Sequence, residues 1–255
     1  MSPTGLPIPR AGAASAPLLE DSPPLRACLL SGGVSRRMGR DKALLLHPEG
    51  GTWLERTLRL LLALQIPVTL FSRHEQHLRI AHALSWDAPG NSETPADPAT
   101  AATRQGDVVA PARTAAITPL EEPPPWEGPL LALQRLMQRY DGERLLLCPV
   151  DMPDLSLAVL QDLLTATAES PGGRIHLAHD GKRLQPLLGV YPSLEPLRSE
   201  LTAAVQRGER RLQGWLATQA IKTVRLDPKA LRNVNHPQDA AAPGAVSRTE
   251  REPST

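Results

Sequence analysis

Short apolar runs that end abruptly at glycine, proline or charged residues recur along the chain and predict buried β-strands. Leu25–Leu30 is the first run, and it leads almost directly into Gly32-Gly33, as a strand entering a loop does. Two later runs flank Asp180-Gly181, a dipeptide typical of a hairpin turn. The predicted strands are Leu25–Leu30, Val68–Phe71, Arg144–Cys148, Ile175–Ala178, Leu184–Tyr191 and Ile221–Leu226.

Between these runs, apolar residues recur at spacings of three and four, the period of an amphipathic helix. Thr52 is suited to cap the first such segment, in which Glu55, Arg56 and Arg59 separate the leucines. The predicted helices are Thr52–Leu64, Glu75–Leu84, Leu130–Tyr140, Ser156 to about Ala168, Leu194–Arg207 and Arg211–Ala220. Strands alternating with helices predict an α/β fold, a three-layer sandwich with a mostly parallel sheet and one antiparallel excursion.

The prolines divide the chain into a domain and irregular segments. Of the 27 prolines among 255 residues, six fall in residues 1–24 and nine in residues 89–129. We therefore expect a disordered N-terminal extension over 1–24 and a disordered tail over 241–255. The domain itself is expected to span 25–240, with a flexible insertion at about 87–116 and order returning near Ile117.

Charge and cysteine content exclude several classes of protein. Twenty-eight Lys and Arg residues against 27 Asp and Glu residues give a net charge of +1, so no electrostatic excess favours nucleic acid or an anionic membrane. No apolar stretch is long enough to span a bilayer, and the two cysteines lie in apolar runs, where small core residues are expected. These features predict a soluble, cytoplasmic protein without a disulfide framework.

The loop after the first predicted strand carries the clearest chemical signal. Leu30-Ser31-Gly32-Gly33 is followed by Arg36-Arg37 and then Lys42, so glycines that let backbone N–H groups approach an anion precede three cations. Lys42 is one of only 4 lysines against 24 arginines. The loop lacks the Gly-Lys-Ser/Thr end of a Walker A motif, and it does not fit the GxGxxG spacing. It predicts a polyphosphate site of another kind.

A second loop follows the strand Arg144–Cys148 and contains Asp151 between two prolines. In open α/β sheets, ligands bind at the carboxyl ends of strands, so this carboxylate is expected beside the glycine loop. Mg²⁺ commonly uses one or two carboxylates together with substrate phosphates. Asp151 is therefore the predicted metal ligand.

The motifs LSGGVSRRMGRDKALL, GPLLAL, CPVDMPDL, LQPLLGVYP, RRLQGWL and NVNHPQD, in this order over roughly residues 25–240, resemble those of the molybdenum cofactor guanylyltransferases. The opening motif is shared by many nucleotidyltransferases, and the last motifs give the narrower resemblance. It implies a Rossmann-like, GT-A-like nucleotidyltransferase fold and an enzyme that transfers GMP from GTP to molybdopterin (Mo-molybdopterin). The product would be the molybdenum guanine dinucleotide cofactor, and pyrophosphate would be released.

The resemblance also implies roles for single residues. Leu30, Ser31, Gly32 and Gly33 would wrap the nucleotide, Arg37 and Lys42 would hold its triphosphate, Asp151 would bind Mg²⁺, and Asn233 and Asn235 would face molybdopterin. Molybdoenzyme apoproteins or their chaperones would be further partners, receiving the product.

The chain departs from the family pattern near the expected base site. A family asparagine after the second strand is absent from residues 71–74, and a family aspartate before GPL appears here as Glu121-Glu122, of which we assign Glu122 to the nucleotide. Trp126 is a further candidate for the border of the base pocket. No cysteine or carboxylate completes a metal site with His74, His77 and His82, so we expect these histidines to be surface or packing residues.

Two other functions fit the motifs. One is a CTP-dependent cytidylyltransferase acting on molybdopterin or on a sugar or polyol phosphate, since the opening loop does not read the base. The other is a non-catalytic nucleotide or cofactor carrier with the same fold, although a carrier does not require Asp151 together with Arg37 and Lys42.

Overall fold

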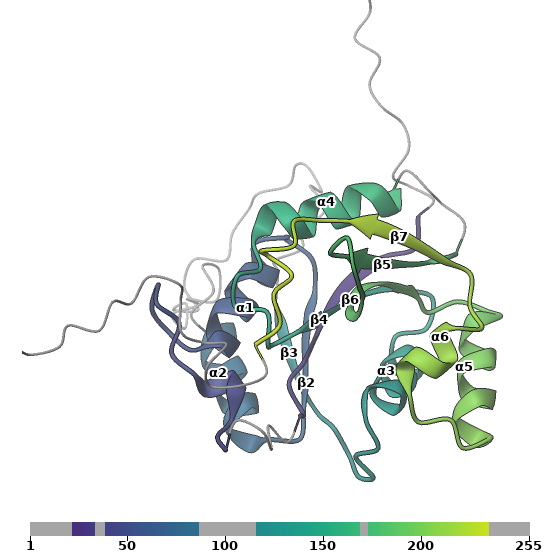
Figure 1. Cartoon of the computed structure of the whole chain (residues 1–255). Helices are drawn as coiled ribbons and strands as arrows, with labels where there is room; N and C mark the ends of the chain where they lie inside the picture. The colour runs from purple at the N-terminus through teal and green to yellow at the C-terminus, as the bar shows by residue number, and fades with distance from the viewer. Residues whose placement is uncertain (1–21, 34–38, 87–115, 169–172, 235–255) are drawn as a thin grey trace, which may run out of the picture.

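The computed structural model describes residues 22–33, 39–86, 116–168 and 173–234. Its seven strands form one sheet in the order β3-β2-β1-β4-β6-β5-β7 (Figure 1). The strands are β1 Leu25–Leu30, β2 Val68–Ser72, β3 Ile117–Glu121, β4 Arg144–Pro149, β5 Ile175–His179, β6 Leu184–Pro192 and β7 Ile221–Arg225. The helices are η1 Lys42–Leu44, α1 Trp53–Leu62, α2 Glu75–Trp86, α3 Pro129–Arg139, α4 Leu157–Ala168, α5 Leu197–Gln206 and α6 Leu212–Leu216.

The sheet is parallel except at β6. Strands β3, β2, β1 and β4 pair in parallel, β6 is antiparallel to both β4 and β5, and β7 is again parallel to β5. The predicted α/β class, the mostly parallel sheet and the hairpin around Asp180-Gly181 are thus confirmed.

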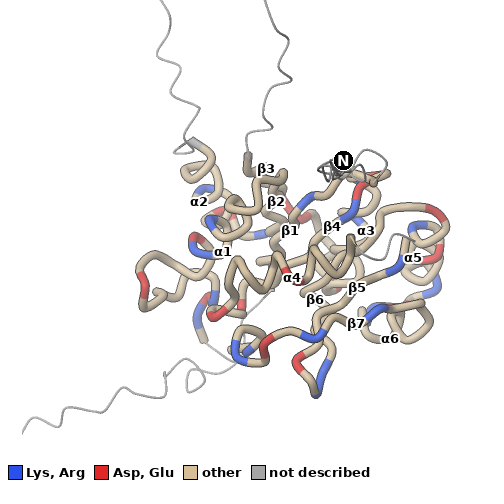
Figure 2. Tube along the Cα trace, turned by 90° about the horizontal axis from the view of Figure 1, so that it is seen from above, with Lys and Arg blue, Asp and Glu red and all other residues tan. Residues whose placement is uncertain are grey.

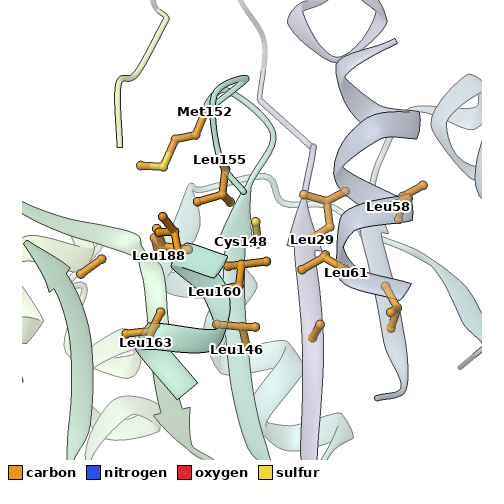
Figure 3. Packing of buried hydrophobic residues seen from close by; sticks show 14 of the residues in the cluster. Leu29, Leu58, Leu61, Leu146, Cys148, Met152, Leu155, Leu160, Leu163 and Leu188 are labelled. Atoms are coloured by element: carbon orange, nitrogen blue, oxygen red, sulfur yellow. The ribbon is translucent and has the colours of Figure 1, made fainter. Parts of the chain in front are cut away.

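Helices cover both faces of the sheet, because its central strands are apolar on both sides. Along β1, Ala27 and Leu29 belong to the core under α1, α2 and α4, whereas Cys28 belongs to the core under α3, α5 and α6. Figure 3 shows Leu58 and Leu61 of α1 together with leucines of β1, β4 and α4 in the first of these cores. Because each fully buried leucine contributes about 1.5–3 kcal/mol, the two cores hold the central strands firmly in register.

The two cysteines are core residues, as the sequence predicts. Cys28 and Cys148 are free and fully buried, and burial raises the pKa of each thiol to about 12.

Local capping explains where α1 begins. The Thr52 hydroxyl accepts a hydrogen bond from the N–H of Glu55 at 3.2 Å, and the Glu55 carboxylate accepts one from the N–H of Thr52 at 2.6 Å. This reciprocal box satisfies two donors that a helix start otherwise leaves unpaired. The predicted cap at Thr52 is therefore confirmed.

The pattern of apolar residues does not predict two short elements, β3 and η1. Strand β3 contains Pro119 and ends in a charged residue, so its composition does not suggest a strand, yet it pairs with β2 over its whole length. As the edge strand it can tolerate a proline that a central strand would exclude. The single turn η1 is set by Asp41, whose carboxylate accepts a hydrogen bond from the N–H of Ala43 at 3.0 Å.

The expected domain limits stay predictions. The expected extension over 1–24, the insertion at about 87–116 and the tail over 241–255 lie wholly or mostly outside the residues that the structure describes. Just before β1, the backbone oxygens of Pro23 and Pro24 accept hydrogen bonds from the side chain and the backbone N–H of Arg144.

The described surface mixes charges of both signs. Figure 2 shows Lys and Arg interspersed with Asp and Glu around the periphery, as the net charge of +1 leads one to expect. Among the described helices, none is long and apolar enough to cross a membrane.

Candidate nucleotide site

The strand order reverses beside β1, and the candidate site lies at that point. From β1 the chain passes to β2 on one side, and β4 occupies the other side. A crevice therefore opens at the carboxyl ends of β1 and β4, the usual ligand position in such sheets. A cavity of about 310 Å³ lies there, lined by Leu30, Ser31, Gly32, Gly33, Asp41, Lys42, Ala43, Phe71, Arg73, Glu122, Trp126, Gly128, Pro129, Ala132, Pro149, Val150, Asp151 and Leu187.

A second hollow of about 680 Å³ is larger but shares only Asp41 with this cavity. It lies over the loop between η1 and α1 and is bordered by exposed Leu46 and by the ion pair of Arg232 with Asp154. The smaller cavity is the better candidate, because the glycine loop and both central strand ends open into it.

The phosphate end of the cavity, defined here by Gly32, Gly33, Lys42 and Asp151, joins the two predicted loops. Lys42 Nζ lies 3.5 Å from Asp151 Oδ2, and the exposed fractions of these two side chains are 14% and 26%. Burial raises the pKa of Asp151 above its ordinary value, while neighbouring Lys42 acts to lower it. The pair is thus a half-buried cation and anion placed directly beyond β1 and β4.

Three carboxylates line the cavity, and they differ in their existing partners. Asp41 is committed through both oxygens, one to the N–H of Ala43 and the other to His77. Glu122 lies against Gly32 and 3.8 Å from Arg135 Nη1. Asp151 pairs with Lys42 through Oδ2, and its side chain is 26% exposed, so this carboxylate can still reach a divalent cation in the cavity.

Among the described residues, no group of three or more His, Cys, Asp or Glu side chains is arranged to hold a metal ion. Mg²⁺ fits this donor set, because it binds readily through one carboxylate and completes its shell with water and phosphate oxygens.

The opposite end of the cavity, called here the base end, comprises Glu122, Arg73, Trp126 and Gly128. A Cβ atom on Gly32 would force the Glu122 carboxylate to move, so the glycine lets this side chain lie close against the loop. The Glu122 side chain is 9% exposed. Burial raises its pKa, against the opposing influence of Arg135 and Arg73.

Trp126 forms the outer wall of the base end. Its Nε1 donates a hydrogen bond to the backbone oxygen of Glu122 at 2.9 Å, and the Arg73 guanidinium lies 5.0 Å above its ring. Although fixed in this way, Trp126 is 51% exposed. A large aromatic surface that is anchored but still open to solvent suits a flat ligand.

Gly128 turns the chain from this wall into α3. Its φ of 102° lies in the left-handed region that favours glycine, and Pro129 follows as the first residue of the helix. The N-terminus of α3, with its unpaired N–H groups, therefore borders the cavity.

Most of the predicted site residues come together here. Leu30, Ser31, Gly32, Gly33, Lys42, Glu122 and Asp151 all line the one cavity. Of the pair Glu121-Glu122, only Glu122 does so, while Glu121 is exposed. Arg37 and Asn235 lie outside the described residues, so the structure does not test them.

Asn233 does not line the cavity, although it is close to the Asp151 loop. Its amide donates to Gln185 Oε1 at 2.9 Å, and the Gln185 amide donates to Asp180 Oδ2 at 3.2 Å. The next residue, Val234, donates its N–H to the backbone oxygen of Asp151 at 3.0 Å. Asn233 is therefore a neighbour of the phosphate end on the β6 side.

Sequence reasoning missed several residues that the structure brings to the site. Arg73 had a usable signal, since it follows the carboxyl end of β2 at the same edge as Ser31. Asp41 had a weaker one, as the residue before Lys42. His77 and Gln185 had none, because their contacts join segments far apart in the chain.

Comparisons with known proteins agree with this geometry. The family model described as "MobA-like NTP transferase domain" matches residues 27–224. A curated protein of Rhodopirellula baltica named "Probable molybdenum cofactor guanylyltransferase" is 34% identical over 229 residues, 87% of this chain and 92% of that protein. A protein of the same name from Synechococcus elongatus is 30% identical over 84% of this chain and 94% of its own length.

Solved structures show the same fold. Molybdopterin-guanine dinucleotide biosynthesis protein A from Archaeoglobus fulgidus superposes with a TM-score of 0.57 at 16% identity, covering 84% of this chain and 94% of that one. The 4-diphosphocytidyl-2C-methyl-D-erythritol synthase from Anaerococcus prevotii also reaches 0.57, at 11% identity, covering 86% and 93%. At these identities the likeness is one of fold.

Proposed function

Because this chain belongs to the family of MobA-like NTP transferases and is a nucleotidyltransferase, we propose that it transfers GMP from GTP to molybdopterin (Mo-molybdopterin). The products are the molybdenum guanine dinucleotide cofactor and pyrophosphate. The names of relatives that share 30–34% of their residues with this chain over most of its length support this choice.

The observation that carries the proposal is the 3.5 Å pair of Lys42 with Asp151 beside Gly32 and Gly33. A phosphate monoester is already substantially ionised at pH 7, so it can attack the α-phosphorus of GTP without a strong general base. The bond from that phosphorus to the oxygen of the leaving pyrophosphate then breaks. The obstacle is repulsion between anions, and Lys42, Arg37 and the loop N–H groups supply the opposing charge.

Asp151 would hold the divalent cation, taken here as Mg²⁺, which when bound neutralises phosphate charge. The protein's part is to keep that carboxylate ionised and fixed. Lys42 favours its ionised form, and the hydrogen bond from Val234 to the backbone of Asp151 holds the loop. Lys42 itself is well placed to move from this carboxylate to a phosphate oxygen when the nucleotide arrives.

The base end supports guanine. Guanine presents N1–H and N2–H donors along one edge and a carbonyl acceptor beside them. An ionised Glu122 accepts from the donors, the N–H groups at the start of α3 suit the carbonyl, and Trp126 covers a ring face. Cytosine offers only one exocyclic amine donor to the same carboxylate, which makes CTP the weaker fit.

The acceptor is proposed to bind on the β6 side, toward Asn233 and Asn235. Asn233 lies there next to the backbone that carries Asp151. Molybdoenzyme apoproteins or their chaperones would accept the finished cofactor.

The deciding experiment is incubation with molybdopterin, Mg²⁺ and each nucleoside triphosphate separately, with mass detection of the dinucleotide and assay of pyrophosphate. We expect product with GTP and little with CTP, ATP or UTP. Product with CTP alone would establish a cytidylyltransferase. Tight GTP binding without pyrophosphate release from any acceptor would instead establish a carrier.

A further inference from the structure

A buried histidine on α2 contacts both described ends of the glycine loop. His77 has an exposed fraction of 0%. Its Nε2 lies 2.9 Å from Asp41 Oδ2, and its Nδ1 lies 3.1 Å from Ser31 Oγ and 3.0 Å from Ser72 Oγ. His77 does not line the cavity, so it is separated from any ligand by the residues that it contacts.

The chemistry of these partners assigns the proton on the imidazole ring. A carboxylate only accepts hydrogen bonds, so Nε2 carries the hydrogen and donates to Asp41. Nδ1 is then an acceptor, and the Ser31 hydroxyl donates to it. The Ser72 hydroxyl lies 3.5 Å from the backbone oxygen of Ser31, to which it can donate. The neutral ring is fully satisfied in this arrangement.

The position of these contacts along the chain gives them their meaning. Ser31 immediately precedes Gly32, and Asp41 immediately precedes Lys42. The imidazole therefore links Ser31, which precedes the glycines, to Asp41, which precedes the phosphate-binding lysine. The second oxygen of Asp41 starts η1, the turn on which Lys42 lies.

We propose that His77 is a positioning residue for the phosphate end: through Asp41 it fixes where the Lys42 ammonium lies relative to Gly32 and Gly33. This inference rests on the proposed function only in that Lys42 binds a polyphosphate. A preorganised cation loses less entropy on binding, and small misplacements of binding groups cost large factors in rate.

Three variants separate this role from simple packing. His77→Gln keeps a donor that can reach Asp41, His77→Asn is too short to reach it, and His77→Leu offers no polar group at all. His82→Leu, an exposed position on the same helix, is the matched control. Inorganic tripolyphosphate with Mg²⁺ is the probe, because it needs the loop and Lys42 but neither the base end nor the acceptor.

We expect His77→Leu and His77→Asn to weaken tripolyphosphate binding about tenfold, the lower end of what loss of an outer supporting partner costs at bound-ion sites. His77→Gln should recover most of the affinity, and His82→Leu should not change it. In a Lys42→Ala background, His77→Asn should have little further effect, since the interaction that it supports is already gone.

Several results would overturn the proposal. One is an affinity for tripolyphosphate that is equal in His77→Asn and the unmodified chain. Another is equal affinity in His77→Gln and His77→Asn, and a third is full additivity of His77→Asn with Lys42→Ala. Thermal unfolding of each variant identifies losses due to misfolding. No tripolyphosphate binding by the unmodified chain would also refute it. By contrast, a chain that binds tripolyphosphate with this His77 dependence but makes no dinucleotide from GTP would refute only the proposed function.

Discussion

The phosphate end and the base end of the cavity are built from different parts of the sheet. Gly32, Gly33 and Asp151 follow β1 and β4, central strands that are buried on both faces. Glu122 and Trp126 follow β3, the edge strand, and belong to the coil that leads to α3. The triphosphate, which all nucleoside triphosphates share, would thus bind at the buried central strands. The base, which differs among them, would bind at the coil after the edge strand, where substitutions disturb the core less.

The two ends also use a carboxylate in different ways. Burial raises the pKa of both Asp151 and Glu122, but Asp151 faces a lysine inside the cavity, while Glu122 is opposed mainly by Arg135 and Arg73. We expect charge neutralisation from the first and hydrogen-bond selection from the second. Substitutions at the two ends should therefore produce different kinds of loss.

The largest effect is expected for Asp151→Asn. A neutral amide of nearly the same size cannot offset the charge of a cation, so transfer should fall by about 10³-fold or more while the fold is kept. The measurement is the rate of dinucleotide formation at saturating Mg²⁺, together with a thermal unfolding curve. Asp154→Asn, a nearby carboxylate paired with Arg232 at the surface, is the control. Normal turnover in a folded Asp151→Asn protein would reject the metal assignment.

Lys42→Ala should come next, with a loss on the order of 10²-fold. Because the lysine acts on phosphates, the loss should be the same for GTP as for any other triphosphate that binds. Lys182→Ala, on the exposed β5–β6 turn, serves for comparison. A loss confined to GTP would place Lys42 at the base instead and would break the division into two ends.

Glu122→Gln should reduce selectivity more than overall binding. Replacing the carboxylate removes one charged acceptor, and such a hydrogen bond is worth roughly tenfold or more in affinity. We expect GTP affinity to fall about tenfold while CTP affinity changes little, as measured by calorimetry. Glu121→Gln tests the neighbouring exposed acid and should leave both affinities unchanged. Parallel losses for GTP and CTP would contradict guanine selection by Glu122.

The smallest effect concerns stability. Since burial raises the pKa of Glu122, the folded chain holds its proton more tightly than the unfolded chain does. Stability therefore falls as pH rises from the ordinary glutamate pKa through the raised one, and the full cost of ionisation is present above it. Glu122→Gln should raise Tm at pH 7, by no more than about 4 °C.

The same comparison repeated at lower pH supplies the internal control. The gain in Tm should shrink as pH falls below about 4, where the unmodified side chain becomes protonated in both the folded and the unfolded state. A gain in Tm that is independent of pH would mean that packing, and not the ionisation of Glu122, causes the difference in stability between the variant and the unmodified chain.

The amino-acid sequence by itself determined the elements and the centre of the site. The apolar runs gave β1, β2 and β4 to within a residue or so, because strands buried on both faces must be continuously apolar. Gly32, Gly33 and Asp151 could be identified because they closely follow such strands, and strand ends of a parallel sheet meet at one edge. Lys42 could be identified as a cation of the loop that the two glycines begin.

Only the tertiary structure decided the rest. The edge strand β3 contains a proline and little apolar surface, so its pairing with β2 is visible only once the sheet exists. The sequence already assigned Glu122 to the nucleotide, but the contact of its carboxylate with Gly32 exists only because the end of that strand lies beside the glycine loop. His77 reaches Ser31 and Asp41 across 46 and 36 residues of chain, and no local pattern encodes a hydrogen bond of that range. Local sequence specifies backbone conformation and burial, whereas contacts between separated segments arise only when packing brings those segments together.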